Sequence, residues 1–172
     1  MNSVRESQQF EPACAAAHTP QEGQTNPPRY ILVVDDDIAI RQLSTEVLIR
    51  SGYAVDAAED GAAGWEALQA RRYDLLITDN SMPKVSGVEL LKKLRGQDAT
   101  LPVIMATGAI PTKQLEQHPW LAINTILLKP YTTSELLRTV GEVLRATIGA
   151  REQIVPLPNG QRQPSADGLQ TW

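Results

Sequence analysis

Acidic, hydroxyl and amine side chains follow four of the short apolar runs in this sequence. They are Asp35, Asp36 and Asp37 after the run at 31–34, Asp79 after 75–78, Thr107 after 103–106, and Lys129 after 125–128. Neighbouring carboxylates repel one another and resist losing water. We therefore expect the triple aspartate to stay solvated, to cap a helix, or to bind a cation.

This set of side chains suits a hard cation and a phosphoryl group. Clustered carboxylates, backbone carbonyls and water are the ligands that Mg²⁺ prefers. An aspartate alone at the end of a strand, as Asp79 is, can attack phosphorus and form an acyl phosphate. Such a transfer depends on positioning and charge neutralisation, which Mg²⁺ and Lys129 would supply. The Thr107 hydroxyl could then bond the new phosphoryl oxygens.

Each of these residues also has an ordinary structural explanation. Asp37 directly precedes the apolar segment at 38–40, so we interpret it as a helix cap. Asp79 and Thr107 could be turn residues, and Lys129 could be a surface lysine. Only their joint occurrence at strand ends favours a common site.

The apolar runs alternate with segments that carry helical spacing or helix-start signals. Strands are expected at 30–34, 53–57, 74–78, 102–106 and 125–128. Five strands alternating with five helical segments predict a parallel sheet with helices on both faces. Ligands bind such sheets at the carboxyl ends of the strands, where the reactive residues lie.

Local signals mark where the helices begin and end. They are an N-cap at Asp60, capping boxes at Ser86 with Glu89 and at Thr132 with Glu135, and a stop at Gly52. We expect the fourth helix to be short, because Pro119 ends the segment that begins at Thr112.

Composition limits the broad class of the protein. The 172 residues are 42% hydrophobic, enough for a globular core, and no apolar run has the length of a membrane span. There is no signal-peptide layout, and the single Cys14 fits a reducing cytoplasm. A net charge of −4 and no basic stripe argue against binding nucleic acid. We expect a disordered arm at 1–29, one domain at 30–150 and a flexible tail at 151–172.

The central segment resembles the receiver domain of bacterial two-component response regulators. The matching stretches are ILVVDDDIAIR, AEDGAAGWEAL, YDLLITDNSMPKVSGVELLKKLR, LPVIMATG and LLKPY, in that order. The resemblance implies a flavodoxin-like, doubly wound (βα)5 fold with a five-stranded parallel sheet in the order 2-1-3-4-5.

The resemblance also implies a role for each matching residue. Asp79 would be the phosphoacceptor, Thr107 the switch hydroxyl and Lys129 the phosphoryl-binding lysine. The Mg²⁺ ligands would be Asp35, Asp36, Asp79 and the backbone carbonyl of Ser81. Pro130 would follow Lys129 through a cis bond, as is usual in the family.

Three positions depart from the family pattern. Ile126 stands where an aromatic residue often couples to the switch threonine. The segment at 119–120 replaces a common Gly-Ala, which predicts a remodelled fourth helix. Ser86 replaces an aspartate, with an effect confined to helix capping.

We therefore expect a stand-alone receiver, because the short segment after residue 150 leaves no room for an output domain. A histidine kinase or phosphotransfer protein would donate the phosphoryl group. Output would come through a downstream protein, a homodimer or onward phosphotransfer, with no nucleic-acid or membrane contact. We expect no enzyme activity beyond self-phosphotransfer and autodephosphorylation.

Two other functions compete with this one. The chain could be a phosphorylation-independent interaction module on a receiver fold. It could also be a phosphohydrolase of the haloacid-dehalogenase kind. The second is disfavoured, because the segment after the aspartates lacks the hydroxyl residue that such enzymes use.

Overall fold

The structure is a computed structural model that describes residues 27–97 and 100–152. Most of the expected arm, including Cys14, and most of the expected tail lie outside the described residues. Within the described part, no helix is long and apolar enough to span a membrane.

Strands and helices alternate along the whole described chain. In order they are β1 (Tyr30–Val34), α1 (Ile38–Arg50), β2 (Ala54–Ala58), α2 (Gly61–Ala70), β3 (Leu75–Thr78), α3 (Gly87–Arg95), β4 (Val103–Thr107), α4 (Thr112–Gln117), the 3-10 turn η1 (Pro119–Leu121), β5 (Thr125–Leu128) and α5 (Thr133–Glu152). The strands form one parallel five-stranded sheet in the order β2-β1-β3-β4-β5. The predicted fold class and strand order are confirmed.

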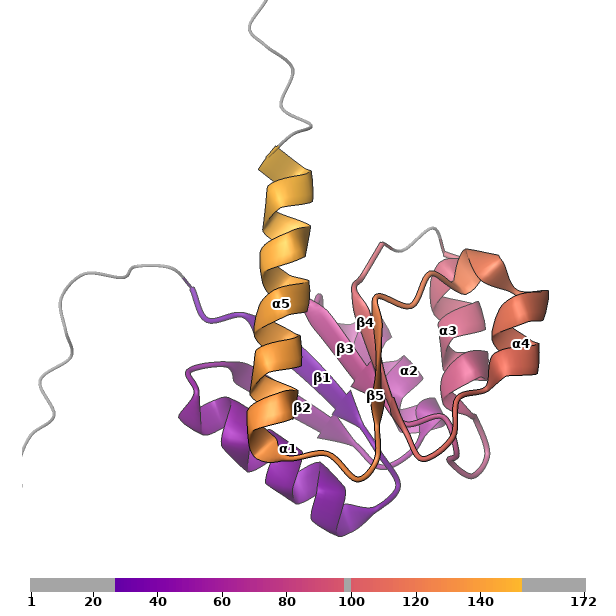
Figure 1. Cartoon of the computed structure of the whole chain (residues 1–172), viewed down its shortest axis with the longest axis horizontal. Helices are drawn as coiled ribbons and strands as arrows, with labels where there is room; N and C mark the ends of the chain where they lie inside the picture. The colour runs from indigo at the N-terminus through magenta and orange to yellow at the C-terminus, as the bar shows by residue number, and fades with distance from the viewer. Residues whose placement is uncertain (1–26, 98–99, 153–172) are drawn as a thin grey trace, which may run out of the picture.

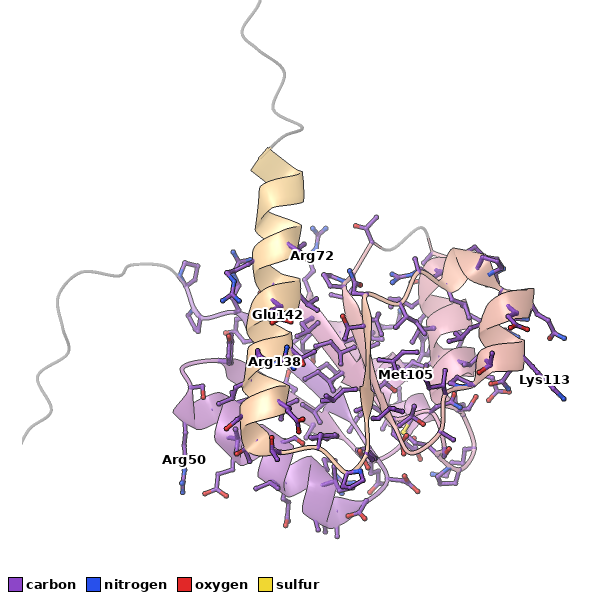
Figure 2. The ribbon with its side chains drawn as sticks, viewed as in Figure 1. Arg50, Arg72, Met105, Lys113, Arg138 and Glu142 are labelled. Atoms are coloured by element: carbon purple, nitrogen blue, oxygen red, sulfur yellow. The ribbon has the colours of Figure 1, made fainter. Side chains whose placement is uncertain are left out.

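Both faces of the sheet are covered, which explains why its central strands are continuously apolar. α1 and α5 pack on one face, while α2, α3 and the α4–η1 segment lie on the other (Figure 1). Side chains alternate between the two cores: Ile31 and Val33 point to the first, and Leu32 and Val34 to the second. Met105 on β4 belongs to the second core, in the middle of the molecule (Figure 2).

The predicted helix signals are present. Asp37 caps α1 by accepting hydrogen bonds from the Ala39 and Ile40 amides, and Asp60 caps α2 in the same way. Both predicted capping boxes form, one at the start of α3 and one before α5. Gly52, just past the end of α1, has a φ of 90°, a conformation that glycine adopts without strain.

The fourth helix is short, as predicted. The chain that follows it is fixed by hydrogen bonds from Arg95, the last residue of α3. The Arg95 guanidinium donates hydrogen bonds to the carbonyls of Leu101, Leu121 and Ala122. Ala122 has a φ of 47°, in the left-handed region that non-glycine residues seldom occupy. Arg95 thus stabilises the turn that leads from η1 into β5.

The element boundaries differ slightly from those predicted. β2 and β4 each lie one residue later than expected, β3 begins one residue later, and α5 ends at Glu152. The far end of α5 extends beyond the sheet (Figure 1).

Candidate functional site

Asp35, Asp79 and Lys129 meet at the carboxyl edge of the sheet. Lys129 Nζ donates a hydrogen bond to Asp35 Oδ2 at 2.7 Å and lies 3.2 Å from Asp79 Oδ2. The Asp79 amide donates to the Val34 carbonyl at 2.8 Å, which places the end of β3 beside the end of β1. The peptide bond after Lys129 is cis. One ammonium therefore bridges two carboxylates that would otherwise repel each other.

Burial and pairing shift the pKa values of Asp35 and Lys129. Asp35 and Asp79 are only 3% and 7% exposed. Burial raises the pKa of Asp35, and the hydrogen bond and charge of Lys129 oppose this rise without cancelling it. Burial alone would lower the pKa of Lys129, but its pairing with Asp35 and Asp79 outweighs burial and raises that pKa. Lys129 therefore carries its positive charge at neutral pH.

Asp36 completes a group of three carboxylates. One oxygen atom each from Asp35, Asp36 and Asp79 lie within 4.8 Å of one another. Asp35 already accepts hydrogen bonds from Lys129 and from the Asp37 amide, whereas no described residue donates one to the exposed Asp36 carboxylate. Three carboxylates at this spacing fit a divalent cation that prefers oxygen ligands, such as Mg²⁺.

The loop after β3 is fixed through Asn80. The Asn80 amide donates to Asp79 Oδ1 at 2.6 Å, and its side-chain oxygen accepts from the Val88 amide at 3.1 Å. The Gly87 amide also donates to the Asn80 carbonyl, at 3.2 Å. The end of β3 is thereby joined to the start of α3. Ser81 lies exposed on this loop, and metal binding by its carbonyl stays a prediction.

Thr107 lies at the same edge of the sheet, but its hydroxyl is engaged by its own loop. It is fully buried, and its Oγ1 donates to the Ala109 carbonyl at 3.1 Å. The Thr107 carbonyl accepts from the Lys129 amide at 3.0 Å, so the two residues are neighbours through the backbone. Ile126 pairs with Met105 across the sheet and packs in the second core. Because residue 126 is isoleucine, no aromatic ring is present at that position to couple to Thr107.

Two contacts of the site loops were missed by the sequence analysis. Lys84 has a φ of 64°, and its Nζ pairs with Asp60 Oδ2 at 2.6 Å. This pairing, with the capping amides, lowers the pKa of Asp60. No sequence signal links these two residues, because the contact depends on how α2 packs beside the loop after β3.

The second missed contact comes from α1. Arg41 Nη1 donates a hydrogen bond to the Asp35 carbonyl at 2.6 Å. The acceptor is a backbone carbonyl, which every residue carries, so the sequence held no signal for this contact.

Comparisons with known proteins agree on one family. Residues 31–141 match the family described as response regulator receiver domain. Response regulator MprA of Mycobacterium tuberculosis H37Rv is 33% identical over 117 residues, which are 68% of this chain and 51% of that protein. The sensor protein EvgS of Escherichia coli O157:H7 is 39% identical over 106 residues, 62% of this chain and 9% of that protein.

Solved structures give the same result. The chemotaxis response regulator CheY4 of Vibrio cholerae is similar with a TM-score of 0.62 and 31% identity, covering 67% of this chain and 98% of that one. A CheY-like receiver domain protein from Methanospirillum hungatei gives a TM-score of 0.68 at 26% identity, covering 72% and 98%. The chain spans about half the length of response regulator MprA, one of the curated relatives that it matches.

Proposed function

The chain belongs to the response regulator receiver domain family, and on this premise we propose that it accepts a phosphoryl group on Asp79 in a Mg²⁺-dependent reaction. Receiver domains are signalling modules of two-component systems rather than classical enzymes. The observation that carries the proposal is the Asp79 carboxylate, 3.2 Å from the Lys129 ammonium and grouped with Asp35 and Asp36.

The donor would be the phosphohistidine of a histidine kinase or of a histidine phosphotransfer protein. A carboxylate oxygen of Asp79 attacks phosphorus, a P–O bond forms, and the P–N bond breaks with its electron pair returning to the imidazole. Lys129 is placed to neutralise the charge that gathers on the phosphoryl oxygens, since its ammonium already contacts Asp79. Asn80 holds the nucleophile through its amide.

The cation would be held by the carboxylates of Asp35, Asp36 and Asp79, with the Ser81 carbonyl as a further ligand. When bound, Mg²⁺ supplies charge neutralisation and orientation for the transferring group. Two observations support this assignment: the group of three carboxylates, and the exposed Asp36 carboxylate, to which no described residue donates a hydrogen bond.

The signal would leave the domain through a change at the loop after β4. In the present conformation the Thr107 hydroxyl donates to Ala109. Bonding to a phosphoryl oxygen instead would withdraw that hydrogen bond and shift the loop that leads to α4, which biases a two-state equilibrium. The partner that reads this change would be a protein, a second copy of the chain, or a phosphotransfer protein in the cytoplasm.

The interaction-only alternative is not favoured. It requires no reacting groups, yet Asp79, Lys129 and the acidic pair lie together at one edge of the sheet. Ile126 pairs with Met105 and packs against the second core, so its replacement of an aromatic residue would bear on signal transmission rather than on the chemistry at Asp79.

The proposed function predicts one phosphoryl adduct when the protein is incubated with acetyl phosphate and Mg²⁺. Intact-mass measurement would detect it, and hydroxylamine should remove it because an acyl phosphate is cleaved by that nucleophile. EDTA in place of Mg²⁺ should prevent it. An absence of adduct both with acetyl phosphate and with a panel of phosphorylated histidine kinases would contradict the proposal.

The lifetime of the acyl phosphate should depend on Ala109. Ser81 and Ala109 are small and exposed, on the loops that follow β3 and β4, so we expect neither side chain to obstruct water that approaches a phosphoryl group on Asp79. We expect Ala109→Met to slow autodephosphorylation by roughly three- to tenfold, an effect equal to a modest barrier increase. Loss of the adduct after removal of the donor would be followed by intact mass. An unchanged decay rate would remove this explanation.

A further inference from the structure

Arg41 contacts every carbonyl of the acidic run. Its Nη1 donates to the Asp35 carbonyl at 2.6 Å and, with a longer contact, to the Asp36 carbonyl at 3.4 Å. Its backbone amide donates to the Asp37 carbonyl at 2.9 Å. One residue of α1 therefore holds three consecutive peptide groups in the loop that follows β1.

The two candidate metal ligands in this loop differ in how they are fixed. Asp35 is held independently, because its amide donates to the Ala58 carbonyl and its carboxylate accepts from Lys129 and from the Asp37 amide. Asp36 is exposed, and among the described residues none donates to its carboxylate. The position of the Asp36 carboxylate is therefore set by the backbone that Arg41 holds.

We propose that Arg41 is a positioning residue for the divalent cation, fixing the backbone of Asp35 and Asp36 so that Asp36 is presented beside Asp35 and Asp79. The inference rests on the proposed function, since it assumes that the three carboxylates bind Mg²⁺. Arg41 directs its planar guanidinium at peptide carbonyls and leaves the carboxylate oxygens of Asp36 to the cation.

A purely electrostatic role for Arg41 predicts the opposite sign. A guanidinium near the site repels Mg²⁺, so removing its charge alone would tighten cation binding. Removing a positioning group loosens the ligand set and weakens binding, typically by tenfold or more. The direction of the change therefore separates the two roles.

The test measures Mg²⁺ affinity by isothermal titration calorimetry on the metal-free full chain. We expect Arg41→Gln to raise the Kd about tenfold and Arg41→Lys, which keeps the charge but not the planar fork, to give an intermediate value. Arg50→Gln is the matched control, with the same charge change on the same helix. Arg50 pairs with Glu46 and projects away from the site (Figure 2). The Mg²⁺ Kd of the Arg50→Gln variant should therefore equal that of the wild type.

A second readout does not depend on the cation. Amide hydrogen exchange in EDTA should be faster at residues 36–38 in Arg41→Gln than in the wild type, and unchanged there in Arg50→Gln. A Kd for Arg41→Gln that is equal to or lower than that of the wild type would overturn the inference alone. A Kd for Arg41→Lys equal to that of the wild type would also overturn it, because a positive charge without the planar guanidinium would then be sufficient for Mg²⁺ binding. A wild-type chain that binds no Mg²⁺ would overturn the proposed function and this inference with it.

Discussion

Replacing Asp79 with asparagine is expected to abolish the phosphoryl adduct formed from acetyl phosphate and Mg²⁺. The amide oxygen is a far weaker nucleophile than a carboxylate, and it cannot form the acyl phosphate. The fold should survive, because the asparagine oxygen can still accept the Asn80 amide and Lys129 keeps its shorter contact with Asp35. Intact-mass spectra of the wild type and Asp79→Asn under identical conditions would measure the difference.

Asp37→Asn is the matched control for that substitution. Asp37 caps α1 through Oδ1, and asparagine caps a helix about as well as aspartate. We expect this variant to be phosphorylated at a rate close to that of the wild type. An adduct that persists in Asp79→Asn at the wild-type rate would show that another residue is the acceptor. Loss of the adduct in Asp37→Asn would show that the third aspartate has a role beyond capping.

The fold could be predicted from sequence because its signals are local. β1 and β3 are buried on both faces, and this burial explains the continuously apolar runs at 31–34 and 75–77. Capping residues one turn from their partners, such as Ser86 and Glu89, are also readable without a structure. The grouping of the candidate site residues followed from the same logic, because parallel strands bring their carboxyl ends to one edge.

Contacts between distant segments could not be predicted in this way. The pairing of Lys84 with Asp60 depends on the left-handed backbone at Lys84 and on the packing of α2. The Thr107 hydroxyl donates to the Ala109 carbonyl, and because every residue carries a carbonyl, the sequence does not indicate which one is the acceptor. The carbonyl contacts of Arg41 involve no complementary side chain, so no residue pattern announces them.

The glycine at the start of α3, Gly87, belongs to the motif that resembles receiver domains, but the physical reason for it appears only in the geometry. A Cβ added at Gly87 would lie 2.2 Å from the Asp79 carbonyl oxygen and 3.0 Å from Asn80 Cα. Both are backbone atoms, which cannot turn aside as a flexible side chain could. The close approach exists because the Gly87 amide donates to the Asn80 carbonyl and α3 begins directly against the end of β3.

Gly87→Ala is therefore expected to destabilise the domain by about 1–3 kcal/mol and to slow phosphorylation of the molecules that remain folded. The added methyl group must push α3 away from β3, and the peptide that it displaces is that of the nucleophile, Asp79. Thermal unfolding would report the first effect, and the rate of adduct formation well below the unfolding midpoint would report the second.

Gly141→Ala in α5 is the matched control, because the same substitution is expected to leave stability unchanged or to raise it there. There the added Cβ meets only the mobile end of Arg145, at 3.2 Å from Nη1, and alanine favours the helix by about 1 kcal/mol over glycine. We expect Gly141→Ala to unfold at the same or a higher temperature and to be phosphorylated normally. Equal stability of the two variants would show that the backbone around Asp79 relaxes freely. A Gly87→Ala protein that is less stable but phosphorylated at the normal rate would show that α3 can shift without moving the nucleophile, and the contact would then serve stability alone.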